Sequence, residues 1–173
     1  ETRLLSSGPR TNPWFRECSM RPIERDDLVS FDTDLIGPYG YCSDISRAWL
    51  CGDRPNDEQR RLYAAAYEQI ETNIAVLGPG LSFREVSQRC WKIPKAYLSQ
   101  RYPSLMHGVG LADEYPSIKH WVDFEAKAYE GVLQPGMVLC VESFIGVEGG
   151  REGVKLEEQV IITETGTERM SSY

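Results

Sequence analysis

Six side chains of the kind that ligate metal ions lie in or beside segments with the composition of β-strands. They are Asp32, Asp34, Asp44, His107, Glu142 and Glu157. Oxygen-rich donors with one imidazole suit iron, Mn or Co, with Zn as a further alternative. The five carboxylates together carry a charge of −5, and two divalent cations would offset most of their repulsion if they converge. The residue types therefore predict a site for two divalent transition-metal ions.

Each of these residues also has an ordinary structural explanation. Aspartates are common at exposed turns, so Asp32, Asp34 and Asp44 could form an acidic hairpin that binds nothing. A single histidine such as His107 is more often a structural residue than a ligand. The metal hypothesis therefore depends on the whole set rather than on any one member.

A predicted hairpin places the three aspartates. Residues 28–31 and 45–50 have the β-branched and aromatic content of strands, and Gly-Pro-Tyr-Gly at 37–40 supplies a turn. Side chains alternate along a strand, so Asp32 and Asp34 share a face that Asp44 can reach from the partner strand. We expect this face to be one wall of the metal site.

The remaining elements predict an α+β fold. Asn56 opens a helix whose apolar stripe continues to Gly78, and Ser82 with Glu85 opens a second helix that Pro94 should end. Residues 136–145 and 153–162 read as strands joined by Gly149-Gly150, and residues 1–22 as a loop or an irregular strand pair. We expect two helices over a curved antiparallel sheet, with the acids on its concave face.

Composition limits the classes of partner. A net charge of −7 and a pI near 4.9, without a dense basic cluster, argue against nucleic acid and anionic membranes. Five widely spaced cysteines suit free thiols in a reducing compartment, so the cytoplasm is expected. The chain begins at Glu1 without Met or a signal pattern, so we expect a fragment or a processed chain.

The order of the motifs resembles the creatinase/methionine aminopeptidase family. The aspartates are followed by His-Gly-Val-Gly at 107–110, Val-Glu at 141–142 and Leu-Glu-Glu at 156–158, and the resemblance covers residues 14–168. It implies a pita-bread fold, a homodimer and two metals. The implied ligands are an Asp of the 32/34 pair, Asp44, His107, Glu142 and Glu157. Residues 1–173 would be part of a C-terminal metal-binding catalytic domain whose N-terminal region is absent.

Three departures from that family's peptidases resemble one branch, the DddP-type dimethylsulfoniopropionate lyases. Asp34 adds a carboxylate within Phe-Asp-Thr-Asp, Asp113 stands where the peptidases have a histidine, and Trp14 or a neighbour replaces another. The branch implies iron and a β-elimination that yields dimethyl sulfide and acrylate from a small zwitterionic substrate. It also implies that Tyr102 binds the substrate, and we add Trp14 as a second aromatic candidate because ring faces attract a sulfonium.

Asp113 is the predicted general base. It follows His107 by six residues, beyond two glycines that let the backbone pass near the site. Its alternative role is a cap on the turn before Tyr115-Pro116, in which case Glu114 is the next candidate base. Two other functions stay open: a metallo-aminopeptidase or Pro-dipeptidase, and a non-catalytic pita-bread binding module.

Overall fold

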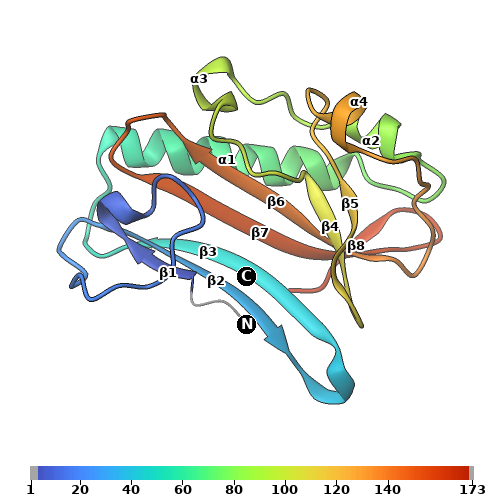
Figure 1. The fold of residues 1–173 in the computed structure, drawn as a ribbon, viewed down its shortest axis with the longest axis horizontal. Helices are drawn as coiled ribbons and strands as arrows, with labels where there is room; N and C mark the ends of the chain where they lie inside the picture. Colours follow the sequence, from blue (N-terminus) through green and yellow to red (C-terminus); the bar gives the residue numbers. More distant parts are fainter. Residues whose placement is uncertain (1–3, 172–173) are drawn as a thin grey trace.

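The computed structural model describes residues 4–171. Within them, two antiparallel sheets lie side by side with helices on one side (Figure 1). The first sheet consists of β1 (Leu4–Ser7), β2 (Leu28–Ile36) and β3 (Cys42–Leu50). The second has the order β5 (Asp113–Ile118), β4 (Met106–Val109), β6 (Val138–Gly146), β7 (Gly153–Ile162) and β8 (Thr167–Arg169). The helices are α1 (Asp57–Ala75), α2 (Phe83–Arg89), α3 (Lys95–Leu98) and α4 (Phe124–Lys127), with the 3-10 turns η1 (Gly8–Arg10) and η2 (Pro38–Gly40).

The predicted hairpin is confirmed as β2 and β3. Its register pairs Asp34 with Asp44 and Asp32 with Ser46, so the acids share one face. The turn η2 contains Tyr39 with a φ of 61°, followed by Gly40 with a φ of 82°. This left-handed backbone reverses the chain within a few residues.

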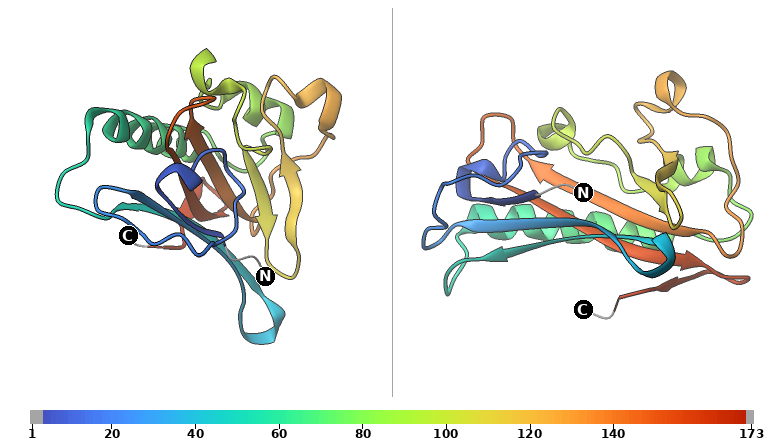
Figure 2. Two further views of the ribbon diagram at one scale, coloured as in Figure 1. Left: turned by 60° about the vertical axis from the view of Figure 1, so that its left-hand side comes forward. Right: turned by 60° about the horizontal axis from the view of Figure 1, so that its bottom comes forward.

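Helix α1 covers the back of β6 and β7. A capping box between Asn56 and Gln59 starts it, as the sequence predicts. Its buried stripe includes Leu62, Ala66 and Ile70, which belong to the same apolar core as the inward residues of the two strands. Figure 2 shows this helix along the strands, on the side away from the β2–β3 hairpin.

The second helix also follows its sequence signals. A capping box between Ser82 and Glu85 opens α2, which ends at Arg89, before Pro94. The short helix α3 begins directly after that proline. No helix within residues 4–171 is long and apolar enough to cross a bilayer.

The expectation of a single curved sheet is wrong in one respect, because β3 and β7 are neighbours without a shared backbone ladder. Side chains bridge them instead. The Gln159 Oε1 atom accepts hydrogen bonds from the Asp44 amide and the Ser43 hydroxyl, both at 3.2 Å. Arg47 Nη1 donates to the Glu157 carbonyl at 2.6 Å. Side-chain hydrogen bonds, rather than a backbone ladder, therefore join the two sheets here.

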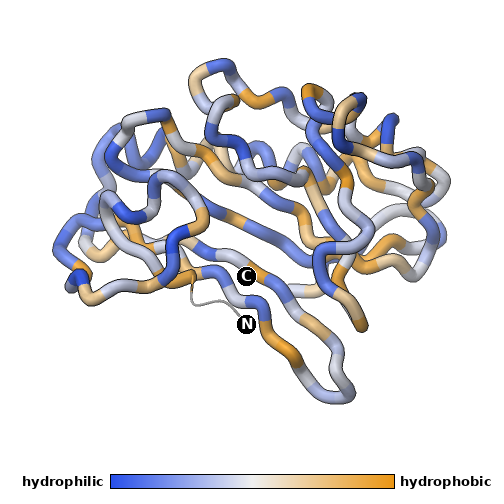
Figure 3. The backbone as a smooth tube through the Cα atoms, viewed as in Figure 1, coloured by the Kyte–Doolittle hydropathy of each residue, from blue (hydrophilic) through white to orange (hydrophobic). Residues whose placement is uncertain are grey.

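Hydrophobic and hydrophilic residues are interleaved along the strands rather than gathered in separate ones (Figure 3). On β6, Leu139, Val141 and Ile145 belong to the apolar core beneath α1. The alternate residues Cys140 and Glu142 therefore point to the opposite face. This alternation positions the site.

Candidate metal centre

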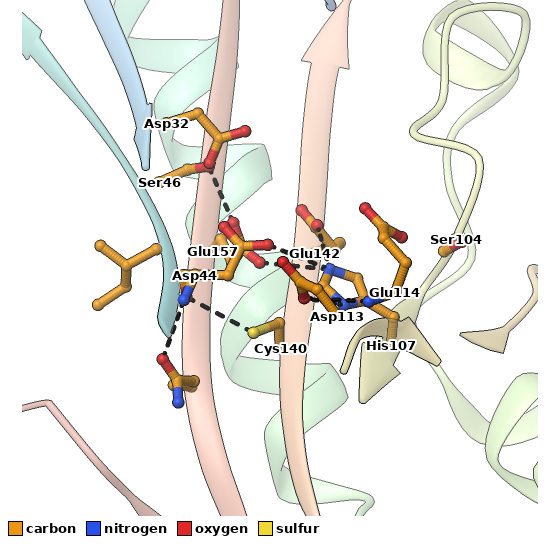
Figure 4. A network of polar contacts seen from close by, with 12 residues as sticks. Asp32, Asp44, Ser46, Ser104, His107, Asp113, Glu114, Cys140, Glu142 and Glu157 are labelled. Atoms are coloured by element: carbon orange, nitrogen blue, oxygen red, sulfur yellow. Dashed lines mark hydrogen bonds and ion pairs between the residues drawn. The ribbon is translucent and has the colours of Figure 1, made fainter. Parts of the chain in front are cut away.

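Five elements bring the predicted ligands together (Figure 4). Asp32 lies on β2, Asp44 on β3, His107 on β4, Glu142 on β6 and Glu157 on β7, and all five are buried. The register of β6 and β7 places Glu142 directly opposite Glu157. Strand pairing thus determines the spacing of the two glutamates, as it does for the aspartates of the hairpin.

His107 is the centre of the cluster. Its Nε2 atom lies 3.1 Å from Glu142 Oε1, 3.6 Å from Asp44 Oδ2 and 3.6 Å from Glu157 Oε1. Three carboxylate oxygens from three different strands therefore face one imidazole nitrogen. A cation at this point would have one nitrogen and several oxygen donors around it.

The donor atoms form two groups, and within each group they lie within 4.8 Å of one another. The first contains Asp44, His107, Cys140 and Glu157, and the second contains Asp32, Asp34 and Asp44. Asp44 belongs to both, which is the arrangement expected of a carboxylate shared by two ions. Its Oδ1 atom and Glu157 Oε1 are buried without a hydrogen-bond partner. These residues fit a pair of divalent cations.

The electrostatics agree with that fit. Burial, followed by repulsion from Glu157, raises the pKa of Asp44 to about 10, and burial raises the pKa of Asp32 to about 6. Burial lowers the pKa of His107, but its contacts with Glu142 and Glu157 outweigh that effect and raise it to about 12. The cluster holds more negative charge than its surroundings stabilise, so protons or metal ions must neutralise it.

The sequence reasoning missed Lys155, which is wholly buried inside the cluster. Its ammonium pairs with Glu142, lies 3.2 Å from Glu157 Oε2 and 3.8 Å from Asp32 Oδ2. The chain itself therefore supplies one of the cations that offset the five carboxylates, in addition to the metal ions that the residue types predict. Lys155 stands two residues before Glu157 in a strand, so alternation alone could have placed it on this face.

The sequence reasoning also missed Cys140, although alternation could have placed it on this face too. It stands two residues before Glu142 and opposite His107 in the β4–β6 register. Its thiol is buried and lies 3.5 Å from the Asp44 carbonyl oxygen, and burial raises its pKa. A buried, protonated thiol is a poor nucleophile, so Cys140 lines the site without an obvious reactive role.

Asp113 lies beside the cluster. Its Oδ1 atom is 3.6 Å from His107 Nδ1, on the ring edge opposite the three carboxylates. The same oxygen accepts a hydrogen bond from the Glu114 amide at 3.0 Å. Burial raises the pKa of Asp113, whose side chain is 24% exposed. The residue makes the capping bond and also lies beside His107, so both roles considered for it are compatible with its position.

The two aromatic candidates cover the ammonium of Lys155. The Lys155 Nζ atom lies 4.6 Å from the ring centre of Tyr102 and 4.9 Å from that of Trp14. Trp14 and Tyr102 also line a neighbouring cavity of about 480 Å³ with Glu114 and Lys119. The Trp14 Nε1 atom is buried without a hydrogen-bond partner. A substrate cation would therefore meet rings that already hold one cation.

The second histidine of the chain does not join the cluster. His120 is buried, and its Nε2 atom lies 2.9 Å from the Tyr102 carbonyl oxygen. Burial lowers its pKa to about 4. Asp34, by contrast, is half-buried opposite Asp44 at the rim of the centre. The structure thus gathers all six predicted ligands around one centre, and their roles as ligands stay a prediction.

Comparison with known proteins identifies the family. Residues 2–164 match the sequence pattern of the family described as "Metallopeptidase family M24". The chain is 49% and 47% identical, over its whole length, to dimethylsulfoniopropionate lyases DddP from Roseovarius nubinhibens and Roseobacter denitrificans. It spans 39% of the length of each of these lyases.

A peptidase shares the fold. The chain is 33% identical over 97% of its length to a Xaa-Pro dipeptidase from Pyrococcus furiosus, of which it covers 46%. The solved prolidase structure from the same organism superposes with a TM-score of 0.84 at 32% identity, covering 98% of this chain and 48% of that one. The predicted fold and family are confirmed. The chain belongs to the M24 metallopeptidase family, the creatinase/aminopeptidase proteins with the pita-bread fold.

Proposed function

We propose that the protein to which this chain belongs is a metal-dependent lyase that cleaves dimethylsulfoniopropionate to dimethyl sulfide and acrylate. The observation that carries the proposal is the placement of Asp113, whose Oδ1 atom lies 3.6 Å from His107 Nδ1, on the ring edge opposite the three carboxylates that face Nε2. An elimination needs a base that is not consumed as a ligand. The names of the two relatives at 49% and 47% identity support the same activity.

The proposed reaction is a proton abstraction followed by loss of a neutral sulfide. Asp113 takes the proton from the carbon next to the substrate carboxylate, the electron pair forms the new C=C bond, and the C–S bond breaks. Burial keeps the pKa of Asp113 above its ordinary value, which makes the carboxylate a stronger base. When bound, the metal would stabilise the negative charge that develops on the substrate carboxylate.

The ligands we propose are Asp32, Asp34, Asp44, His107, Glu142 and Glu157. All but one of these donors are oxygens, which suits iron, Mn or Co, with Zn as a further alternative. The resemblance to the DddP-type lyases is what favours iron among them. For substrate binding we propose Tyr102 and, with it, Trp14, whose buried indole N–H has no partner. A homodimer stays a proposal of the family resemblance, and light scattering of the purified protein would test it. A cytoplasmic location stays a proposal that rests on the five cysteines.

The test is release of dimethyl sulfide by the intact natural protein and by its Asp113→Asn variant. Asn keeps the side-chain oxygen that accepts from the Glu114 amide, so folding and bound metal should stay near those of the parent. Turnover should fall by about 10²–10⁴-fold, because a positioned base contributes that much. Parent-like turnover in this variant would make Asp113 structural.

Glu114→Gln is the matched control. Glu114 is the adjacent acid and lines the neighbouring cavity with Tyr102. The proposal expects this variant to keep most of the turnover, whereas loss of activity here and not in Asp113→Asn would transfer the role of the base to Glu114. Metal content measured on the same samples separates loss of a base from loss of the metal.

The alternative function is Pro-dipeptidase activity, favoured by the Pyrococcus furiosus relative and its structure. The family resemblance implies that its peptidases use histidines outside the metal ligands to hold the peptide substrate. The only histidine of the chain besides His107 is His120, which is engaged with the Tyr102 carbonyl. We therefore expect no cleavage of X-Pro dipeptides, and rapid cleavage would favour the peptidase. A purified protein without tightly bound transition metal would favour the binding module.

A further inference from the structure

Within residues 4–171, the edge of β3 that faces β7 pairs with no other strand. An edge strand leaves backbone N–H and C=O groups without partners. Here side chains satisfy two of these groups, because the Asp44 amide donates to Gln159 Oε1 at 3.2 Å and the Ser46 carbonyl accepts from Arg47 Nη1 at 3.0 Å. The contact between the two sheets therefore depends on a few side chains rather than on a ladder.

Arg47 makes the strongest of these contacts. Its Nη1 atom also donates to the Glu157 carbonyl at 2.6 Å, and its Nη2 atom pairs with Glu158 Oε1 at 2.7 Å. The Arg47 and Glu158 side chains are only 12% and 14% exposed, so water screens this pair less than it screens a surface pair. Glu158 alternates with Glu157 along β7, which places the ion pair on the side of the strand away from the metal-ligating face.

Each bridge ends on the backbone of a candidate metal ligand. Gln159 of β7 bonds the Asp44 amide, and Arg47 of β3 bonds the Glu157 carbonyl. Asp44 and Glu157 belong to different sheets, yet their donor atoms lie within 4.8 Å of each other. Because no ladder fixes that separation, the two bridges are the contacts placed to fix it.

We propose that Arg47, Glu158 and Gln159 form an inter-sheet clasp, a set of positioning residues that fixes the separation of the Asp44 and Glu157 carboxylates and so prepares the centre for metal. None of the three needs to touch an ion to do this. The inference rests on the metal binding included in the proposed function, but not on the identity of the substrate.

A clasp that only stabilised the fold would behave differently. Its removal would lower the free energy of unfolding, but each folded chain would bind metal with the affinity of the parent. If the clasp positions the two carboxylates, its removal must weaken metal binding by the folded chain, because residues that orient metal ligands are worth about 10–100-fold in affinity. Metal affinity therefore separates the two roles without any measurement of turnover.

The experiment measures Mn²⁺ affinity, by competition with a chelator, for the intact natural protein and its clasp variants. Arg47→Met should bind Mn²⁺ about 10–100-fold more weakly than the parent. Glu158→Leu should also bind it more weakly, and the losses of the two variants should not add in the double variant, since both remove the same ion pair. Glu158→Gln retains an oxygen for the guanidinium and should lose less than Glu158→Leu.

Arg84→Met is the matched control. Arg84 pairs with Glu130 at the same distance of 2.7 Å, but this pair involves neither β3 nor β7. The control should therefore leave the Mn²⁺ affinity unchanged.

Hydrogen exchange of the metal-free protein gives a second measurement, in case Arg47→Met does not fold. In the parent, the Asp44 amide should exchange as slowly as the ladder amides of the β2–β3 hairpin, and Gln159→Met should speed its exchange while the amides of α1 stay protected. The proposal is overturned if the Asp44 amide of the parent exchanges like an unprotected amide, or if Arg47→Met folds and binds Mn²⁺ with the parent's affinity. A parent that binds no Mn²⁺ would instead contradict the metal centre itself.

Discussion

The two faces of β6 and β7 are equally buried but chemically opposite. Toward α1, Leu139, Val141 and Ile145 pack against the apolar stripe of the helix and are at most 1% exposed. Toward the hairpin, Glu142 and Lys155 have the same exposure. The strands therefore separate a core from a charged centre by the alternation of their side chains alone.

This contrast teaches that burial does not distinguish a residue that stabilises the fold from one kept for chemistry. Apolar burial contributes about 25 cal/mol for each Å² removed from water. Burying a charge costs free energy, which partners recover only in part. The charged face is retained despite that cost, and its partners are an internal ammonium and, we propose, metal ions.

The largest effect should follow a change on the charged face. Asp44→Ala removes the residue shared by both groups of donors, so bound metal and turnover in the proposed lyase reaction should both fall. We expect a loss of more than about 100-fold in turnover, since even an outer-shell partner of a metal ligand is worth 10–100-fold. Metal analysis and dimethyl sulfide release measure the two effects.

Stability completes the Asp44 test. Removal of a mutually repelling acid should leave the metal-free protein at least as stable as the parent in chelator, because burial and Glu157 raise the pKa of Asp44 to about 10. If Asp44→Ala retained full activity and full metal content, Asp44 would not be a ligand of the metal centre.

The apolar face should respond in the opposite way. Ile70→Ala on α1 removes a side chain that is 2% exposed and opens a cavity against the core. The free energy of unfolding should fall by about 2–5 kcal/mol, while metal content per folded chain stays that of the parent. Denaturant unfolding measures the first quantity. Glu68→Ala, at an exposed position of the same helix, is the control. A loss of bound metal in Ile70→Ala would show that the apolar face also supports the metal centre.

His120, which is buried beside the Tyr102 carbonyl oxygen, should make the stability of the protein depend on pH. Burial lowers its pKa to about 4 in the folded protein, below the ordinary value of 6.5. A group whose folded pKa is depressed contributes stability at high pH, which is lost as the unfolded chain takes up the proton. The loss should therefore develop as pH falls from about 6.5 to about 4, with a size of about 3 kcal/mol.

The comparison of His120 with a non-titrating variant isolates this term, because carboxylates also titrate at low pH. The stability difference between parent and His120→Gln should shrink on acidification, as measured by denaturant unfolding at pH 7 and pH 4.5. A difference that is the same at both pH values would show that His120 is not buried in its neutral form.

The smallest effect should come from charges outside both faces. Arg84 is 40% exposed and pairs with Glu130 at 2.7 Å and with the exposed Glu125. Exposed ion pairs are worth about 0–1 kcal/mol, so Arg84→Ala should change the unfolding free energy by no more than that and leave metal binding intact. A larger loss would show that the contact of the Arg84 guanidinium with the ring of Phe124, 4.5 Å from its centre, contributes to stability as well.

Local signals were sufficient for the main helices and strands. The capping boxes at Asn56 and Ser82 set the starts of α1 and α2, and Pro94 lies beyond the end of α2 as expected. The hairpin and the strands around Glu142 and Glu157 followed from alternation and turn residues. These features depend on neighbours in sequence, so the sequence alone contains them.

The alternation of side chains along a strand also predicts the faces of two residues that the sequence reasoning missed. It places Lys155 on the face of Glu157 and Cys140 on the face of Glu142. A lysine in a strand is ordinarily expected to reach solvent, because its charge is costly to bury without partners. The sequence pattern indicates the face of a strand but not whether that face is covered.

The tertiary structure decided what covers it. Ser46 lies 109 residues from Lys155 along the chain, and Gln159 lies 115 residues from the Asp44 amide that it bonds. Contacts between residues so far apart in the sequence form only when the β2–β3 hairpin docks beside β7. No local periodicity encodes that packing. By itself the sequence determined which residues could ligate a metal and on which side of each strand they stand. Only the tertiary structure decided that two sheets meet there, with a lysine between the acids, because burial and long-range contacts belong to the whole chain.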